Sequence, residues 1–226
     1  MDPIRVIEVK RSVYESNDLE AEKLRGELKE RGVYLLNLMS SPGSGKTTTL
    51  KRVIAALKDR YRIGVMEADI DSDVDAIAIA GTGARSIQLH TGGMCHLDAG
   101  MTKQGLEELL SAGDGSPLDL AILENVGNLV CPAEFDTGAV KSVMILSVPE
   151  GDDKPLKYPL MITVFDPDLI NKIDVMPYFD FDMDHCRENI LSRNPKAKIF
   201  PICAKTGEGI QPFAEYLSGE IDNFKA

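Results

Sequence analysis

Short apolar runs alternate with helical patterns along most of the chain, and this alternation predicts the fold. Apolar runs predict buried strands at residues 33–39, 61–66, 118–123, 141–148, 167–170 and 198–202, with a shorter strand at 86–89. The pattern between them predicts helices at 48–59, from about 97 to 112, at 182–193 and at 210–224. Strands that alternate with helices predict an α/β fold with a three-layer, doubly wound and mostly parallel sheet.

The residues ahead of the first predicted strand form a separate arm. Residues 1–10 are expected to be an extended lead. A charged helix is then expected to begin with Ser16 or Asn17 as its N-cap and to stop at Gly32. We therefore expect two parts, which are an extended and helical arm at 1–32, packed on the domain, and one α/β domain at 33–226.

Composition and charge narrow the class of protein. The 226 residues carry a formal net charge of −11 with a pI near 4.8, so no basic face answers a phosphate backbone and nucleic acid is not an expected partner. Apolar runs fall short of the roughly 18 residues of a membrane span, and Met1-Asp2-Pro3 does not open a signal peptide. We expect a cytoplasmic protein without a membrane partner, whose four cysteines are thiols or metal ligands.

The most informative stretch is Ser40-Ser41-Pro42-Gly43-Ser44-Gly45-Lys46-Thr47, which joins a predicted strand to a predicted helix. A strand, a Gly-rich loop and a helix N-terminus present backbone N–H groups and a lysine ammonium to phosphate oxygens, as in P-loop NTPases. Thr47 can offer its hydroxyl to Mg²⁺. Ser40 stands where the usual motif has glycine. The residues expected to bind phosphate are Gly43, Ser44, Gly45, Lys46, Thr47 and Thr48, with Lys46 also required for turnover.

A second motif, Asn171-Lys172-Ile173-Asp174, indicates which base is bound. The Asp174 carboxylate can accept from N1–H and the exocyclic amine of guanine, whereas adenine would leave it unpaired at a cost of about 1–3 kcal/mol. Lys172 can lie across the base, and Asn171 can tie this loop to the phosphate loop. Alone the motif could be a surface turn, but Ala204 and Lys205 follow the last strand, where GTPases place a loop over guanine. The sequence therefore favours GTP over ATP.

Glu124 and Gly127 follow the buried strand at 118–123, and we expect them to serve Mg²⁺ and the γ-phosphate. A carboxylate at this position reaches Mg²⁺ directly or through water, and a glycine N–H reaches the phosphate. A simple acidic helix cap is the alternative interpretation of Glu124. Cys131-Pro132 begins seven residues after Glu124 and four after Gly127, and we expect it on the same switch segment.

The acidic segment at 67–75 is expected to be a loop beyond a strand end, where open α/β sheets bind ligands. No glutamine like the catalytic one of small GTPases follows Gly127, so a carboxylate of this segment is expected to orient the attacking water. We favour Asp75 for that role and Asp69 near Mg²⁺. Other acidic residues of the segment compete for these roles or are simply solvated, namely Asp71 and Asp73.

Cys95, His96 and Cys131 are the candidate ligands of a transition metal. Thiolate and imidazole together suit Zn²⁺ or Ni²⁺. Three ligands leave a tetrahedral site short, so sharing across a two-fold dimer is attractive. By spacing alone, structural cysteines explain the pattern equally well. Further candidates are His90 and Met94 beside this pair, and His185-Cys186 on a predicted helix.

Several long motifs together resemble one family, the hydrogenase nickel-incorporation GTPases, also called hydrogenase maturation factors. They are phosphate-loop GTPases of the SIMIBI class, whose members dimerise on nucleotide. Urease accessory GTPases are related but carry their metal ligands in a CPH motif, whereas Ala133 follows Cys131-Pro132 here. The matching stretches are NLMSSPGSGKTTTL at 37–50, TGGMCHLDAG at 91–100, ENVGNLVCPAEFDTG at 124–138, SVPEGDDKPLKYP at 147–159, NKID at 171–174 and AKTGEGI at 204–210.

The resemblance implies a GTP-hydrolysing metallochaperone that helps insert nickel into nickel–iron hydrogenase. It implies that Cys95, His96 and Cys131 bind Ni²⁺ or Zn²⁺ at a homodimer interface, that Thr47 and Glu124 serve Mg²⁺, and that Asp174 reads guanine. Implied partners are a nickel-binding maturation protein and the hydrogenase large-subunit precursor. The chain departs from some members because its N-terminus has no cysteine motif or histidine-rich tract, and because Cys203 replaces serine before Ala204.

Two other functions stay open. One is a metal-binding or storage dimer in which GTP hydrolysis is incidental. The other is an accessory GTPase for a different metalloenzyme, such as urease. The residues do not rank Ni²⁺ against Zn²⁺, because the same nitrogen and sulfur ligands serve both ions.

Overall fold

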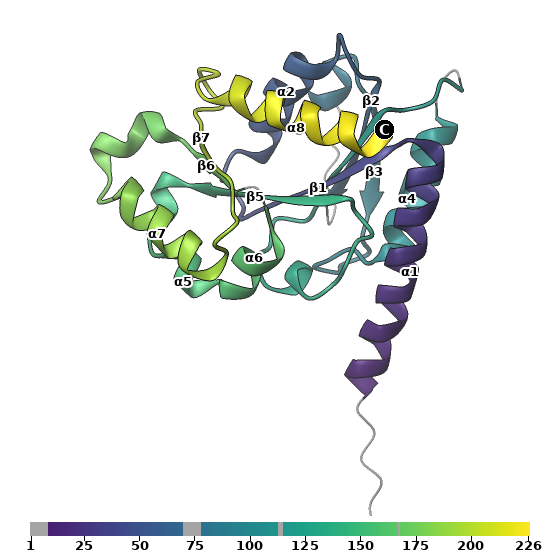
Figure 1. Cartoon of the computed structure of the whole chain (residues 1–226), viewed down its shortest axis with the longest axis horizontal. Coiled ribbons are helices and arrows are strands. Elements are labelled where there is room, and N and C mark those ends of the chain that lie inside the picture. The colour runs from purple at the N-terminus through teal and green to yellow at the C-terminus, as the bar shows by residue number, and fades with distance from the viewer. Residues whose placement is uncertain (1–8, 70–77, 113–114, 167) are drawn as a thin grey trace, which may run out of the picture.

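The computed structural model describes residues 9–69, 78–112, 115–166 and 168–226, which form a seven-stranded sheet between two layers of helices (Figure 1). Every strand pair is parallel, and the strand order is β3-β2-β4-β1-β5-β6-β7. The predicted doubly wound α/β fold is therefore confirmed. The strands are β1 Tyr34–Ser40, β2 Ile63–Asp69, β3 Arg85–His90, β4 Leu120–Glu124, β5 Lys141–Ser147, β6 Asp168–Asn171 and β7 Ile199–Pro201.

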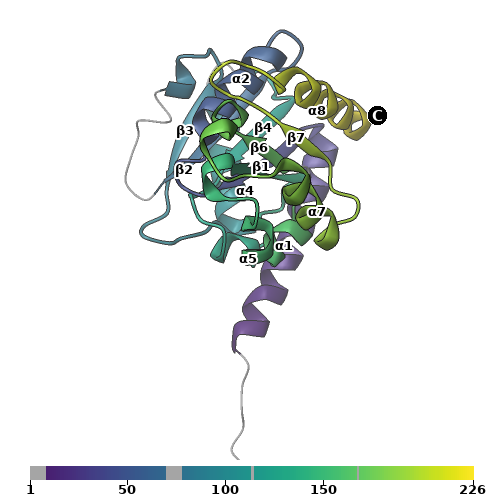
Figure 2. The ribbon, with the colours of Figure 1, turned by 90° about the vertical axis from the view of Figure 1, so that its left-hand side faces the viewer.

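Helices cover both faces of the sheet, because alternate strand side chains point to opposite faces. On one face α2 and α8 pack against Leu36 and Leu38 of β1. On the other face α1, α4, α6 and α7 pack against residues that include Leu35 and Met39 (Figures 1 and 2). The helices are α1 Val9–Arg31, α2 Lys46–Leu57, α4 Ala99–Ser111, α5 Lys154–Lys157, α6 Pro159–Val164, α7 Met183–Arg193 and α8 Ile210–Lys225, with 3₁₀ turns η1 Cys131–Ala133, η2 Val148–Glu150 and η3 Ile173–Tyr178.

The prediction that Ser16 or Asn17 caps the arm helix is wrong, since α1 already begins at Val9. Asn17 lies inside the helix, where its carboxamide serves tertiary structure instead of capping. Its nitrogen donates to Asp136 O, and its oxygen accepts from Ala99 N at the start of α4. The predicted stop is confirmed, because Gly32 follows α1 with a left-handed φ of 65°.

The predicted loop at 67–75 is wrong at its beginning, because β2 continues to Asp69. Glu67 and Ala68 are buried and stay in register with β3. The two short helices α5 and α6 were not predicted. Each has a proline in its first turn, where a missing N–H costs no helical hydrogen bond.

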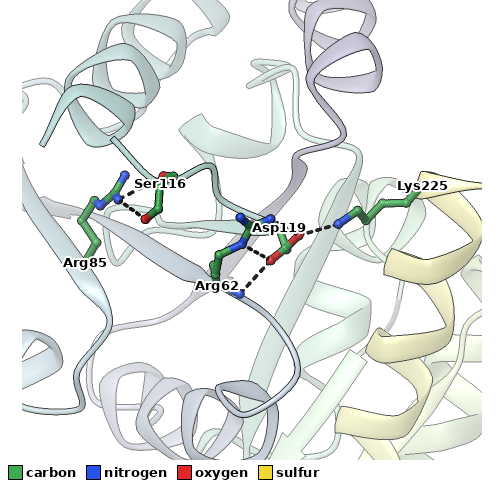
Figure 3. A network of polar contacts seen from close by, with 5 residues as sticks. All are labelled: Arg62, Arg85, Ser116, Asp119 and Lys225. Atoms are coloured by element: carbon green, nitrogen blue, oxygen red, sulfur yellow. Dashed lines mark hydrogen bonds and ion pairs between the residues drawn. The ribbon is translucent and has the colours of Figure 1, made fainter. Parts of the chain in front are cut away.

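A polar network closes the edge of the sheet where the strands begin (Figure 3). Asp119 precedes β4 and accepts from Arg62 Nε at 2.7 Å and from Arg62 Nη2 at 2.9 Å. It also pairs with Lys225, which ties the end of α8 to the strands. Beside it, Arg85 donates to Ser116 and to the last carbonyls of α4. The charged side chains of this network therefore have hydrogen-bond partners within the chain.

No helix among the described residues is long and apolar enough to cross a membrane.

Candidate nucleotide and metal site

A cavity of about 440 Å³ opens at the carboxyl ends of β1, β2, β3 and β4. This is the edge where parallel α/β sheets bind their ligands. Four stretches far apart in the sequence form its walls. They are the phosphate loop and first turn of α2 at 41–48, Glu67 and Ala68 of β2, Gln88 of β3, and the segment 124–127.

The phosphate loop has the backbone that its sequence predicts. Gly45 has φ 97° and precedes α2 directly, and a Cβ there would lie 2.5 Å from Asn171 Nδ2. Position 40 does not require the glycine of the usual motif, because Ser40 still belongs to β1. The Ser44 hydroxyl is buried without a hydrogen-bond partner among the described residues. The first N–H groups of a helix also lack intrahelical partners, so the loop offers donors that suit phosphate oxygens.

Gly127 closes against the phosphate loop. A Cβ at this position would lie 3.3 Å from Pro42 Cγ and 3.5 Å from Lys46 Nζ. A larger residue would therefore press on the loop and on the lysine. Gly127 follows Glu124 by three residues, so the loop after β4 brings a backbone N–H and a carboxylate to the same cavity.

The carboxylate of Glu124 lies beside Thr47, as predicted for a Mg²⁺ site. Thr47 Oγ1 donates to Glu124 Oε1 at 3.4 Å, and Glu124 is only 4% exposed. Sequence analysis missed its neighbour Glu67, which is 3% exposed, pairs with Glu124 in register and lines the same cavity. Two buried carboxyl groups on adjacent strands are oxygen ligands of the kind a divalent cation prefers. The residues present thus fit Mg²⁺.

The predicted catalytic aspartates lie mostly outside the described residues. Asp75 and its competitors Asp71 and Asp73 belong to residues 70–77. Asp69 ends β2, paired in register with His90. A signal for Glu67 was in the sequence, since an acidic residue at the end of an apolar run indicates a strand end that faces a polar site.

Asn171 joins three loops at the far side of the phosphate loop. Its Nδ2 donates to Ser44 O at 2.8 Å. Its Oδ1 accepts from Lys172 N at 2.8 Å and from Ala204 N at 3.0 Å. The predicted tie between the two nucleotide motifs is present, and the same carboxamide also holds the loop that carries Lys205.

Lys172 and Asp174 follow Asn171 at the end of β6, where the turn η3 begins. Lys172 is the one non-glycine residue with positive φ in the described chain, at 64°, and its Nζ donates to Gly43 O at 2.6 Å. Such a backbone costs about 1–2 kcal/mol for a residue with a Cβ, so the hydrogen bonds around it must offset strain. Asp174 and Lys205 are exposed. Arg52 supports the second loop by donating to the carbonyls of Ala204 and Lys205.

Cys95 and His96 lie in the loop between β3 and α4, close to Cys131 at the start of η1. Cys95 Sγ is 3.9 Å from His96 Nδ1. A hydrogen bond with the thiol of Cys131 raises the pKa of Cys95. All four cysteines of the chain are free. Within the described ranges, no three or more His, Cys, Asp or Glu side chains are grouped closely enough to hold a metal ion.

One hydrogen bond links the loop of Cys95 and His96 to the segment that lines the nucleotide cavity. Asn128 follows Gly127 directly, and its Nδ2 donates to Cys95 O at 3.5 Å. Its Oδ1 accepts from Val130 N at 2.9 Å, which holds the chain just before Cys131. A single residue therefore contacts both the loop of Cys95 and the turn of Cys131.

The second adjacent pair, His185 and Cys186, does not converge. Cys186 is buried in the core, where burial raises the pKa of its thiol to about 12. His185 is exposed, with Nδ1 3.5 Å from Asp152 Oδ2. Cys203 is buried, as expected of a small residue at a strand end.

Comparison with known proteins shows the family. A model of the CobW/HypB/UreG nucleotide-binding domain matches residues 34–201. The hydrogenase maturation factor HypB of Rhizobium leguminosarum bv. viciae is 46% identical over 217 residues, which are 96% of this chain and 71% of that protein. The chain belongs to the HypB family of hydrogenase maturation factors. The resemblance read from the sequence motifs is thereby confirmed, together with a nucleotide-binding P-loop fold.

Two further members of the HypB family bear on function. The hydrogenase/urease maturation factor HypB of Helicobacter hepaticus is 40% identical over 211 residues, covering 93% of this chain and 86% of that protein. A crystal structure of HypB from Helicobacter pylori in complex with nickel has a TM-score of 0.86 and 37% identity, and the match covers 93% of this chain and 98% of that one.

Proposed function

We propose that the protein is a GTP-hydrolysing metallochaperone that assists nickel insertion into nickel–iron hydrogenase. The observation that carries this proposal is the single segment 124–131, which runs from the Mg²⁺ side of the nucleotide cavity to Cys131. Asn128 on this segment also contacts the loop of Cys95. A change at the γ-phosphate can thus reach two metal ligands through a few residues of chain.

GTP is the proposed substrate because of the guanine side of the cavity. Asn171 aligns the loops that carry Asp174 and Lys205 with the phosphate loop. Asp174 would accept from guanine N1–H and the exocyclic amine, and the stem of Lys205 would cover the base. The backbone of Ala204 would meet guanine O6. Adenine offers no matching donors to Asp174, so ATP binds more weakly.

Hydrolysis is assigned to groups around the phosphates. Lys46 and the N–H groups of 43–48 would stabilise negative charge that develops on the γ-phosphate. Thr47 and Glu124 would hold Mg²⁺, with Glu67 as a neighbouring carboxyl group. When bound, the ion neutralises phosphate charge. Asp75 would orient the attacking water with Asp69 near the ion, so Asp75→Ala should lower kcat and spare GDP binding.

Nickel is the proposed cargo of Cys95, His96 and Cys131. Thiols and imidazole suit Ni²⁺ and Zn²⁺ alike, and the nickel complex of the Helicobacter pylori relative supports Ni²⁺. One chain supplies three ligands at most from this set, so we propose that a homodimer completes the site across a two-fold axis. A nickel-binding maturation protein would load it, and the hydrogenase large-subunit precursor would receive the metal.

A nickel titration tests the proposal. The thiolate-to-nickel absorption band is followed in GDP and in a non-hydrolysable GTP analogue, for the wild type, Cys131→Ala and the buried-cysteine control Cys186→Ala. We expect a band that needs Cys131, survives Cys186→Ala and changes in affinity with nucleotide. A band that ignores the nucleotide would favour a storage dimer with incidental hydrolysis. Absence of the band in the wild type would overturn the metallochaperone proposal.

Urease is the second candidate target, because the Helicobacter hepaticus relative is named a hydrogenase/urease maturation factor. Nickel transfer from the loaded protein to purified hydrogenase precursor and to purified apo-urease, each with GTP present, compares the two directly. Transfer to urease alone would replace hydrogenase as the target while leaving the GTPase and the cargo unchanged.

A further inference from the structure

The imidazole of His96 lies flat on the ring of Phe135. The ring centroids are 3.8 Å apart and the planes differ by 13°. The Nδ1 atom of the imidazole also lies 3.9 Å from Cys95 Sγ. Both side chains are half-buried. The aromatic stack therefore sets the orientation of a ring that lies in a loop.

A stack on the face of an imidazole leaves its metal-binding atoms open. Ring nitrogens bind a metal through lone pairs that lie in the ring plane. Phe135 covers a face, so it fixes the plane of His96 without covering either nitrogen. The contact is of the kind that aligns a ligand before the metal arrives.

Helix α1 contacts both Phe135 and the residue before it. The ring of Tyr14 is 5.0 Å from that of Phe135, tilted by 52°. The Tyr14 hydroxyl donates to Glu134 Oε2 at 2.6 Å, which holds the residue just before Phe135. Tyr14 of α1 thus contacts two consecutive residues, Glu134 and Phe135.

The residue after Phe135 is held by α1 as well. Arg25 donates to both carboxylate oxygens of Asp136 at 2.9 Å. Asn17 Nδ2 donates to Asp136 O, and Asn17 Oδ1 accepts from Ala99 N, three residues beyond His96. Two residues further along, Gly138 packs so closely on α1 that a Cβ there would lie 2.7 Å from Leu24 Cδ2. The same helix therefore holds the backbone on both sides of the stack.

We propose that Phe135 is a positioning residue for the metal-binding imidazole of His96, and that α1 keeps Phe135 in place. The inference rests on the proposed role of His96 as a nickel ligand. Ordering a free side chain on binding costs up to about tenfold in affinity, which a preformed orientation avoids. Phe135 itself contributes no ligand, so its effect on nickel passes through His96.

Nickel affinity of four variants tests the proposal. Phe135→Leu removes the stack and is expected to weaken nickel binding by about three- to tenfold. Phe135→Tyr keeps a ring and should restore wild-type affinity. Tyr14→Ala removes the support behind the ring and should give a smaller loss in the same direction. Phe200→Leu, in an aromatic cluster against α8, is the matched control and should bind nickel like the wild type.

A mutant cycle with His96→Ala separates positioning from general loss of structure. If Phe135 acts through His96, Phe135→Leu costs nothing further once His96 is absent. An equal loss in both backgrounds would overturn the proposal. A second readout needs no metal, because the His96 ring protons should be shifted upfield in the NMR spectrum of the wild type and lose this shift in Phe135→Leu. An unshifted wild-type signal would also overturn it.

The outcomes distinguish this inference from the proposed function. If the wild type binds nickel and Phe135→Leu binds it equally well, the positioning role fails and the metallochaperone stands. If the wild type binds no nickel, the proposed function fails, and the positioning role fails with it.

Discussion

The two edges of the sheet differ in whether their polar groups have partners within the chain. At the edge where strands begin, the carboxylate of Asp119 is paired with two cations, Arg62 and Lys225 (Figure 3). At the edge where strands end, Lys46 lines the open cavity, and the Ser44 hydroxyl has no hydrogen-bond partner among the described residues. The polar groups of the first network stabilise the fold, whereas Lys46 and Ser44 at the second edge line the cavity for a ligand.

This difference separates stability from function. A group whose partner is in the same chain contributes free energy to folding, and its removal is felt before any ligand binds. A group left open to a cavity contributes little to folding, so its removal costs function alone. Each edge therefore predicts a different outcome for a similar substitution.

The largest expected effect is that of Lys46→Ala at the open edge. Loss of the ammonium should lower GTP turnover by about 10³-fold, as for other groups that stabilise charge in a transition state. The unfolding free energy should stay near that of the wild type. Single-turnover kinetics and urea unfolding measure the two quantities, with Lys51→Ala on the same helix as control. Turnover within tenfold of the wild type would remove Lys46 from the mechanism.

A smaller effect is expected from Asp174→Asn. The amide would set a donor against guanine donors, so GDP and GTP affinity should fall by about 10²-fold. Since Asp174 is exposed, stability should not change. Calorimetric titration with GDP and ADP measures base preference, and Asp180→Asn is an exposed control. If GDP still binds Asp174→Asn as tightly as it binds the wild type, the residue does not read the base.

Asp119→Asn sharpens the comparison at the paired edge. The Arg62 and Lys225 partners hold the pKa of Asp119 well below its usual range. Stability from this carboxylate is therefore present above the unfolded pKa of about 3.9 and is lost as pH falls through the folded pKa. We expect the variant to lose about 2 kcal/mol at pH 7, with unchanged GDP affinity.

Urea unfolding of wild type and Asp119→Asn from pH 7 to pH 3 tests this directly. The difference between the two proteins should shrink as the pH falls below about 4. A difference that stays constant over the whole range would show that the charge of Asp119 is not what stabilises the edge.

Asp168 is the exception at the same edge and has the smallest expected effect. It begins β6, is fully buried, and has no hydrogen bond for either carboxylate oxygen among the described residues. Burial, and then the nearby Asp166, raise its pKa well above the usual value. The folded state thus holds this proton more tightly, so stability falls as pH rises from about 4 through the raised pKa.

Asp168→Asn should therefore stabilise the protein by about 1 kcal/mol at pH 8 and by less at pH 5. Urea unfolding at both values measures it. Asp166→Asn is the control, since Asp166 accepts from Lys198 N and should not give the same gain. A loss of stability at pH 8 would mean that the Asp168 carboxylate has a favourable partner.

The sequence could predict most strands and the loops between them, because buried parallel strands are continuous apolar runs. It could not place the end of β2, because Glu67 is buried beside a ligand cavity and a polar residue in that setting looks like a loop. It also misplaced the start of α1, because Asn17 is a residue type that often caps helices but here forms hydrogen bonds with Asp136 and Ala99.

The candidate site was predictable where one motif supplies both backbone and chemistry. The phosphate loop and Asn171 are of this kind, since each lies at the carboxyl end of its own strand. The stack of Phe135 on His96 was not predictable, because the two residues are 39 positions apart. The helix that contacts Phe135, α1, is also remote from both residues in the sequence. Tertiary contacts of this sort leave no spacing pattern in the chain.

The carboxamide of Asn171 makes the alignment of three loops depend on the chemistry of two atoms. Its nitrogen donates to Ser44 O at 2.8 Å, while its oxygen accepts two backbone N–H groups. Deamidation to aspartate would turn that donor into an acceptor, so two oxygens would face each other and a charge would be buried. A protein changed at this one atom would keep its sheet and lose the alignment of three loops, so a substitution too small to disturb the fold would lower nucleotide affinity.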